Sequence, residues 1–143
     1  MNLLDANLLL YAYDSTNPHH PQAREQLEQL LSRDEPVWLC WPVVLAFVRI
    51  ATNPRLLTQP LEPDEAFAIV DSWLARTNVA WVGPGPGHWA ILKRLIKEGQ
   101  ARGPLVSDAH LAALALEHGA TLLSTDRDFA RFPGLNYTNP LTA

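Results

Sequence analysis

The stretch Leu105-Val106-Ser107-Asp108-Ala109-His110-Leu111-Ala112-Ala113-Leu114-Ala115-Leu116 decides how the rest of the chain is organised. It predicts a helix that is apolar on nearly every side, and such a helix lies buried. Ser107 suits the N-cap, and Asp108 falls in the first turn, where the helix dipole favours an anion. An acidic first turn is an ordinary helix-start signal. The position of Asp108 at the edge of a core nevertheless makes it a candidate functional carboxylate.

The composition of the chain predicts one folded domain, which we expect to span residues 1–143. Hydrophobic residues make up 48% of the chain and charged residues 18%, which excludes a disordered protein. The formal net charge is -4. Contact with a nucleic acid must therefore rely on local Arg and Lys side chains or on metal ions.

Neither the cysteine content nor the N-terminus is typical of an exported protein. Cys40 is the only cysteine, and its apolar surroundings favour an inert buried thiol. The first residues lack a basic segment and carry Asp5, which does not fit a signal peptide. No apolar run approaches the ~20 residues that a membrane span needs. We therefore expect a cytoplasmic protein with no membrane contact.

Apolar runs of the strand type alternate with segments of the helix type along the chain. We expect strands at 2–4, 37–41, 79–82, 121–124 and 136–138. We expect helices at 6–13, 20–33, 43–51, 62–74, 88–99, 108–118 and 126–132. This alternation predicts an α/β fold: a single three-layer domain with a mostly parallel central sheet of about four or five strands flanked by helices.

Two further carboxylates follow apolar strands. Asp5 comes directly after the strand at 2–4, and Asp126 follows the strand at 121–124. Because ligands bind at the carboxyl ends of parallel strands, Asp5 and Asp126 meet there if these strands are neighbours, and Asp108 can complete the group. Three carboxylates without a matching cation raise one another's pKa. A hard cation such as Mg²⁺ or Mn²⁺ relieves that repulsion.

Each acidic residue also has a structural interpretation. Asp126 can be the first residue of a helix capped by Thr125. Asp128 lies three residues after Thr125, which favours a capping-box partner over a metal ligand. Asp5 is the hardest to explain without a function, because a charge between an apolar strand and an apolar helix lies near the core. The chain has no Cys/His cluster with the spacing of a zinc site.

Three segments of the chain resemble the acidic motifs of the PIN-domain ribonucleases. They are Leu3-Leu4-Asp5-Ala6-Asn7-Leu8-Leu9-Leu10, Val106-Ser107-Asp108-Ala109-His110-Leu111-Ala112-Ala113-Leu114-Ala115 and Leu123-Ser124-Thr125-Asp126-Arg127-Asp128-Phe129. The stretches 41–55 and 129–135 resemble one branch of the same family. The similarity is greatest to the VapC-type toxins of bacterial type II toxin–antitoxin modules, and it covers nearly the whole chain.

The resemblance implies an endoribonuclease in which Mg²⁺, or Mn²⁺, activates a water that attacks the RNA phosphate. It implies that Asp5, Asp108 and Asp126 hold the metal and are the catalytic residues. Asn7 and Ser124 match polar positions of the motifs and are expected to orient the carboxylates or the substrate. The family further implies a homodimer and a cognate antitoxin that wraps the toxin and inserts a basic residue at the acidic pocket.

The third predicted helix departs from the family pattern. Many PIN domains carry a Glu there, whereas this chain has Ala46 or Phe47 at that place and no acid between Glu35 and Glu62. The number of metal ions is therefore open. A PIN-like binding protein with weakened catalysis, acting only in a complex, is the main alternative function. Arg49 lies in this otherwise apolar helix and is a candidate partner for an acid, the substrate or the antitoxin.

Several basic side chains are candidate phosphate contacts. They are Arg49, Arg55, Arg127, Lys93, Arg94 and Lys97. The last three also fit a solvated helix face, which we favour. If Arg49 has the expected role, Arg49→Ala weakens RNA cleavage or antitoxin binding.

Two other functions of α/β domains fit the sequence less well. A receiver-type signalling domain needs a Lys on a late strand, and the strand at 121–124 has none. The run Gly83-Pro84-Gly85-Pro86-Gly87 is no phosphate cradle, because its prolines remove backbone N–H groups that such a cradle uses. We interpret it as a rigid turn.

Overall fold

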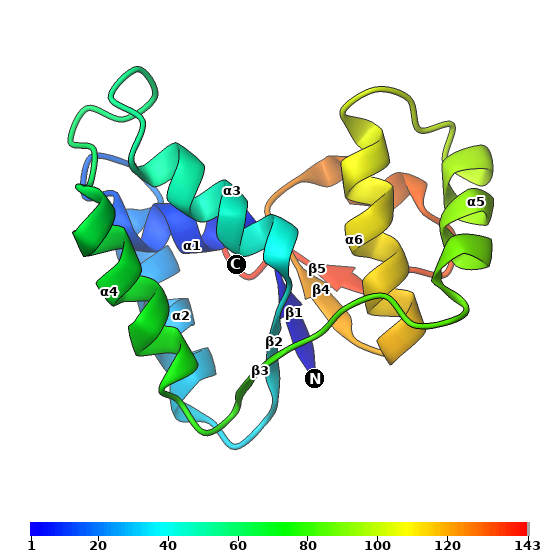
Figure 1. The fold of residues 1–143 in the computed structure, drawn as a ribbon, viewed down its shortest axis with the longest axis horizontal. Helices are drawn as coiled ribbons and strands as arrows, with labels where there is room; N and C mark the ends of the chain where they lie inside the picture. The colour runs from blue at the N-terminus through cyan, green and yellow to red at the C-terminus, as the bar shows by residue number, and fades with distance from the viewer. Residues whose placement is uncertain (143) are drawn as a thin grey trace.

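Five short strands form the central layer of the computed structural model, which describes residues 1–142 (Figure 1). The strands are β1 (Asn2–Leu4), β2 (Val37–Leu39), β3 (Val79–Trp81), β4 (Thr121–Leu123) and β5 (Tyr137–Thr138). All pairings are parallel, and the strand order is β3-β2-β1-β4-β5. The predicted α/β fold with a parallel sheet of about four or five strands is confirmed.

Helices cover both faces of this sheet. They are α1 (Ala6–Tyr13), α2 (His20–Ser32), α3 (Trp41–Ala51), α4 (Pro63–Leu74), α5 (His88–Glu98) and α6 (Leu105–His118), followed by the 3₁₀ helix η1 (Arg127–Arg131). In Figure 1, α1 to α4 lie on one side of the strands and α5 and α6 on the other. No helix within residues 1–142 has the length and hydropathy of a membrane span.

The position of α6 is as predicted, but its start is not. The helix begins at Leu105, and Pro104 occupies the N-cap. Ser107 therefore lies within the first turn and caps nothing, so the predicted N-cap is wrong. The fixed φ of proline suits the start of a helix. Asp108 still falls in the first turn, and Gly119 ends the helix with a φ of 65°.

The second strand is shorter than predicted. β2 ends at Leu39, and Trp41 already belongs to α3 because Pro42 suits its first turn. Trp41 is consequently 60% exposed on a helix instead of lying in a buried strand. Cys40 is buried, as expected.

The strand order places a topological switch point between β1 and β4. The chain runs from β1 to β2 on one side and later returns to β4 on the other. Leu4 of β1 pairs with Leu123 of β4, and the amide of Asp5 donates to the carbonyl of Leu123 at 3.0 Å. The residues that follow these two strands therefore share one edge of the sheet, where ligands bind in open α/β folds.

Candidate active site

Ser124 joins the ends of β1 and β4. Its side chain is completely buried. The hydroxyl donates to Asp5 Oδ2 at 2.7 Å and accepts from the amide of Asp126 at 3.0 Å. Asp5 Oδ1 accepts from the amide of Ala6 at 2.7 Å. The predicted proximity of Asp5 and Asp126 is thus present, and one buried hydroxyl connects the two residues.

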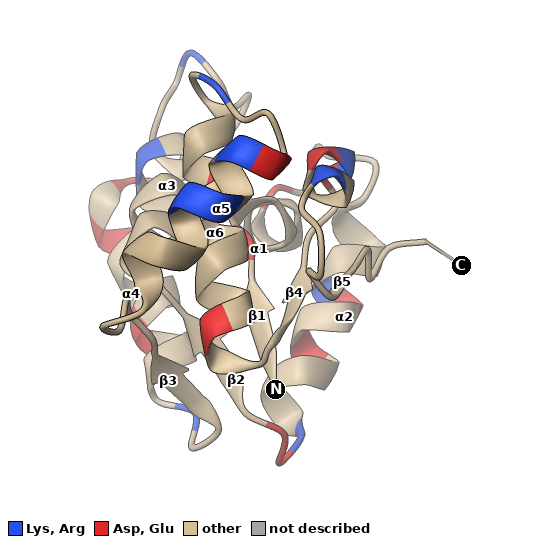
Figure 2. Cartoon of the chain, turned by 90° about the vertical axis from the view of Figure 1, so that its right-hand side faces the viewer, with Lys and Arg blue, Asp and Glu red and all other residues tan. Residues whose placement is uncertain are grey.

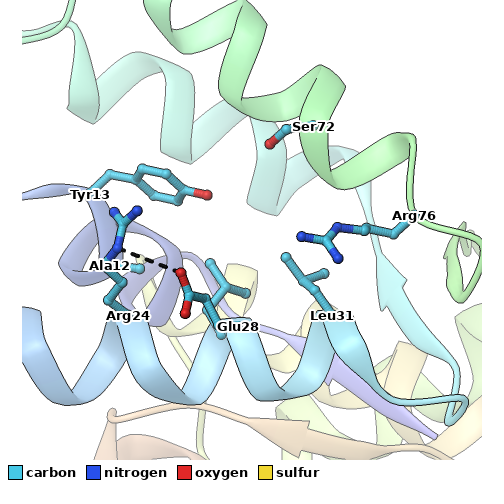
Figure 3. A pocket seen from close by; sticks show the side chains of 8 residues that line it. Ala12, Tyr13, Arg24, Glu28, Leu31, Ser72 and Arg76 are labelled. Atoms are coloured by element: carbon cyan, nitrogen blue, oxygen red, sulfur yellow. Dashed lines mark ion pairs between the residues drawn. The ribbon is translucent and has the colours of Figure 1, made fainter.

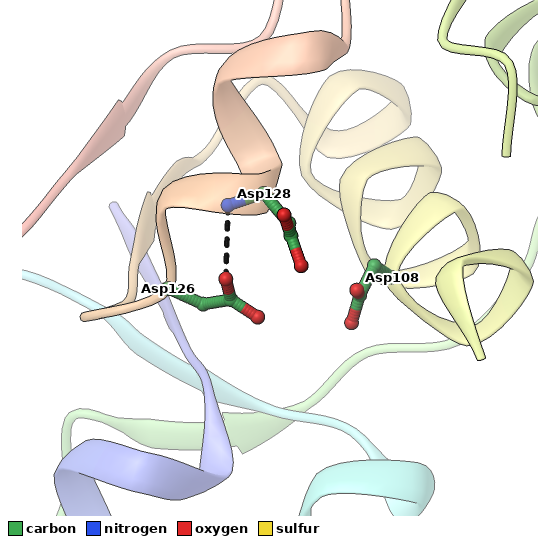
Figure 4. A group of neighbouring side chains, drawn as sticks. All are labelled: Asp108, Asp126 and Asp128. Atoms are coloured by element: carbon green, nitrogen blue, oxygen red, sulfur yellow. Dashed lines mark hydrogen bonds between the residues drawn. The ribbon is translucent and has the colours of Figure 1, made fainter.

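Three carboxylates converge beside this bridge. Asp108, Asp126 and Asp128 each offer one oxygen, and these oxygens all lie within 4.8 Å of one another. Figure 4 shows Asp108 reaching from α6 toward the two aspartates at the start of η1. The set differs from the predicted one by containing Asp128 and not Asp5. An oxygen-only group of this kind suits a hard divalent cation.

Asp128 has a different local role from the one expected. Asp126, not Thr125, is the N-cap of η1, and its Oδ1 accepts from the amide of Asp128 at 2.9 Å. The capping-box interpretation of Asp128 is therefore wrong. Its carboxylate does no capping and extends toward Asp108 (Figure 4). The sequence does contain a signal for the Asp126 cap. Asp128 lies two residues after Asp126, and an Asp side chain often accepts a hydrogen bond from the amide two residues later.

Asp5 and Asp108 line one hollow of the surface. The other lining residues are Ala6, Pro42, Val43, Ala46, Ser107, His110 and Leu111. Ala46 thus faces the hollow at one of the two places proposed for the family's Glu, whereas Phe47 is buried in the core. α3 contributes no acid to the hollow. Asp128 of η1 does not line the hollow but lies close to Asp108, which does.

The electrostatics of the site fit a cation. Burial, followed by repulsion from Asp126, Asp5 and Asp128, raises the pKa of Asp108 to about 6. Burial also raises the pKa of Asp5, although its hydrogen bonds from Ser124 and Ala6 act in the opposite direction. Arg131 offsets part of the charge, since its Nη2 lies 4.0 Å from Asp128 Oδ1. The sequence analysis named Arg49 as a candidate partner for an acid and did not name Arg131, which lies near Asp128.

The remaining predicted site residues have distinct environments. Asn7 Oδ1 accepts from the amide of Thr125 at 3.4 Å, which ties α1 to the turn after β4. Arg49 is exposed, and no carboxylate of residues 1–142 lies within 4.0 Å of it. The prediction that Arg49 pairs with an acid is therefore wrong, while a contact with substrate or antitoxin stays a prediction.

Lys93, Arg94 and Lys97 lie on α5, which faces the viewer in Figure 2. Lys93 lies over the ring of Trp89, 5.7 Å from its centroid, and Arg94 pairs with Glu98 at 3.3 Å. These side chains are exposed. Their local pairing agrees with a solvated helix face, and their contact with phosphates stays a prediction.

A second hollow lies between α1, α2 and α4 (Figure 3). Tyr13, Arg24, Glu28 and Arg76 are among its lining residues. Glu28 is its only acid, and it lies 3.8 Å from Arg24. A single paired carboxylate does not make a metal site, so this hollow is not a second candidate for one.

The raised pKa of Asp108 predicts that the metal-free protein loses stability as the pH rises. Below pH 3.8, the ordinary pKa of Asp, the side chain is protonated in the folded and the unfolded state, whereas above about pH 6 both states carry the charge. The folded state then holds it in repulsive surroundings, so stability falls between these two values. We expect Asp108→Asn to raise the unfolding temperature at neutral pH. If Asp108→Asn raises the unfolding temperature equally at neutral pH and below pH 3.8, the gain does not come from the raised pKa of Asp108.

Comparison with known proteins identifies the family. The model of the PIN domain family matches residues 3–135. VapC ribonuclease Mb2897 of Mycobacterium bovis is 41% identical over 141 residues, which cover 99% of this chain and 96% of the relative. Ribonuclease VapC37 of Mycobacterium tuberculosis is 41% identical over 140 residues, or 98% of this chain and 97% of the relative.

Solved structures support the same fold. A crystal structure of VapBC2 from Rickettsia felis, bound to a DNA fragment from its promoter, gives a TM-score of 0.69 at 18% identity and covers 96% of this chain and 97% of that chain. The structure of Mycobacterium tuberculosis VapC20, a Sarcin-Ricin loop cleaving toxin, gives a TM-score of 0.67 at 15% identity, with coverage of 95% and 99%. Fold and sequence agree: this chain belongs to the PIN-domain family, and within it to the VapC ribonucleases.

Proposed function

We propose that this protein is a Mg²⁺-dependent endoribonuclease and the toxin of a type II toxin–antitoxin module. The observation that carries the proposal is the group of three carboxylates within 4.8 Å of one another at the switch point of the sheet. The pKa of Asp108 in this group is raised to about 6. Carboxylates gathered against their own repulsion are typical of a site that binds a cation for catalysis.

The residues present fit a divalent cation. Asp108, Asp126 and Asp128 would hold it, with Asp5 beside them in the hollow. A divalent cation bound there supplies an activated water and offsets charge on the scissile phosphate. Ser124 and the amide of Ala6 hold Asp5 in place. Arg131, close to Asp128, is available to contact a phosphate oxygen of the RNA.

The test is cleavage of a pool of structured RNAs by the purified, antitoxin-free chain. We expect cuts at discrete positions with Mg²⁺ or Mn²⁺ and none with EDTA. Cleavage that persists in EDTA would indicate a contaminating nuclease. No cleavage by folded protein with either metal would favour the alternative of a binding protein, for which the absence of an acid on α3 is the specific observation.

We also propose that the antitoxin covers an apolar groove between α3 and α4. Trp41, Leu45 and Phe67 line this groove and are 60%, 60% and 53% exposed. The same helix α3 contributes Pro42, Val43 and Ala46 to the acidic hollow. A segment that fills the groove and crosses α3 therefore reaches the hollow. Exposed aromatic residues of this kind are enriched in protein interfaces.

Leu45→Glu is expected to weaken antitoxin binding, measured by calorimetry, by about tenfold or more, as for a central interface residue. RNA cleavage by the free protein should not change, because Leu45 does not line the acidic hollow. Leu56→Glu is the matched control, since Leu56 is also 60% exposed but lies outside the groove. Equal affinities for both variants would place the antitoxin elsewhere. The expected homodimer is a separate proposal, which light scattering of the purified chain tests.

A further inference from the structure

A buried histidine connects the turn before α5 to the acidic hollow. His88 is only 7% exposed. Its Nδ1 lies 3.2 Å from Glu117 Oε1, and its Nε2 lies 3.0 Å from His110 Nδ1. The other carboxylate oxygen, Glu117 Oε2, accepts from the amide of Gly85 at 3.0 Å. This chain of hydrogen bonds ends at His110, which lines the hollow, and the proposed catalysis does not use it.

With both histidines neutral, the order of the groups sets where the protons lie. The Glu117 carboxylate is an acceptor, so it takes the proton of His88 Nδ1. The Nε2 of a neutral His88 is then an acceptor and takes the proton of His110 Nδ1. A neutral His110 consequently carries no proton on Nε2. The chain of hydrogen bonds thus leaves His110 with a free acceptor nitrogen beside the hollow.

His110 lies across the hollow from the carboxylate group. On an α-helix, residues two apart are separated by about 200° around the axis, which places Asp108 and His110 at opposite margins. Ser107 and Leu111 fall between them, and all four residues line the hollow. His110 is not a member of the group that can hold a metal. Its partner is therefore expected to be the substrate.

We propose that His110 accepts a hydrogen bond from a ribose 2′-hydroxyl of the bound RNA and so favours RNA over DNA. This inference rests on the proposed ribonuclease function. A bare imidazole nitrogen repels phosphate oxygens, which are acceptors, and needs a donor. The 2′-hydroxyl is the donor of the RNA backbone that DNA lacks. His88 and Glu117 are positioning residues that act through His110.

Gly85 has a specific part in this arrangement. A Cβ added there would lie 2.6 Å from Glu117 Oε2, so a larger residue pushes the carboxylate away from the amide that holds it. The carboxylate is the end of a flexible side chain and can move without disturbing the backbone. The rigid turn at 83–87 thus places an amide against Glu117. Gly85→Ala becomes a mild probe of the whole chain of hydrogen bonds.

The test is a series of RNA oligonucleotides, each with one 2′-deoxy substitution near the cleavage site. In the wild type, one position should lower kcat/KM by up to about tenfold, the loss expected for one hydrogen bond. In the His110→Leu variant, the 2′-deoxy change at that position should not lower kcat/KM any further. His88→Gln, whose amide oxygen can accept from His110, should keep the penalty, whereas His88→Leu should lose it. His19→Leu is the control, because His19 is exposed at the start of α2 and lies outside the hollow.

An equal 2′-deoxy penalty in the wild type and in His110→Leu would overturn the inference while leaving the ribonuclease function in place. No metal-dependent cleavage by the wild type would overturn both. Nitrogen NMR of the metal-free protein gives an independent readout: His110 Nδ1 should be protonated and Nε2 bare, and Gly85→Ala should mix the two forms. A proton on Nε2 in the neutral wild-type side chain would refute the proposed acceptor.

Discussion

Asp108→Asn is expected to lower metal-dependent RNA cleavage by more than about a hundredfold. Changes to residues that only orient a metal ligand typically cost 10–100-fold in affinity or activity, and Asp108 is placed to be a ligand itself. Its oxygen lies within 4.8 Å of those of Asp126 and Asp128. Asn keeps the shape of the side chain and removes the charge that attracts the cation. The measurement is kcat/KM on a defined RNA, together with calorimetric titration of Mn²⁺.

The matched control for this experiment is Asp34→Asn, because Asp34 is exposed and belongs neither to the hollow nor to the carboxylate group. It should cleave like the wild type. Wild-type cleavage by Asp108→Asn would remove this residue from the site. The expected gain in stability at neutral pH makes the result more specific, since a variant that is more stable and yet inactive has not failed through unfolding.

The same assay decides between two ligand sets. The sequence predicts Asp5, Asp108 and Asp126, whereas the structure groups Asp108, Asp126 and Asp128. A loss in Asp128→Asn close to that in Asp108→Asn would make Asp128 a ligand in place of the absent acid of α3. Normal cleavage by Asp128→Asn, with no cleavage by Asp5→Asn, would favour the predicted set.

The proximity of Asp5 and Asp126 was predictable because it depends on local patterns. Two apolar runs, each followed by an acid, are enough once both are read as parallel strands of one sheet. The register Leu4 to Leu123 then places Asp5 opposite Ser124. The fold followed from the sequence in the same way, through the alternation of strands and helices.

Other features depend on contacts that no local pattern records. His88 meets His110 and Glu117 only because α5 packs along α6, and the residues are 22 and 29 positions apart. Asp128 was misassigned because its distance from Thr125 matches a capping box, while the true cap depends on which side chain reaches the amide. Arg131 is near Asp128 because both lie on η1, which was predicted as a short helix without its orientation.

Ser124→Ala is expected to weaken both the fold and the cleavage of RNA. The hydroxyl of Ser124 is the partner of Asp5 Oδ2 and of the amide of Asp126, and the residue is completely buried. Loss of a buried partner costs about 1–3 kcal/mol of stability. Because Ser124 holds the carboxylate of Asp5 and the backbone of Asp126, cleavage should fall by about 10–100-fold. Denaturant unfolding and kcat/KM give the two values.

Ser107→Ala is the control for Ser124→Ala, because it also removes a serine hydroxyl near the site. Ser107 also lines the hollow, but it is exposed and no hydrogen bond of its side chain occurs within residues 1–142. Its replacement should therefore leave stability unchanged and cleavage close to that of the wild type. If Ser124→Ala is destabilised but binds Mn²⁺ and cleaves RNA like the wild type, Ser124 only joins β1 to β4. If its affinity for Mn²⁺ falls with its activity, the buried hydroxyl is part of what holds the carboxylates in place for the metal.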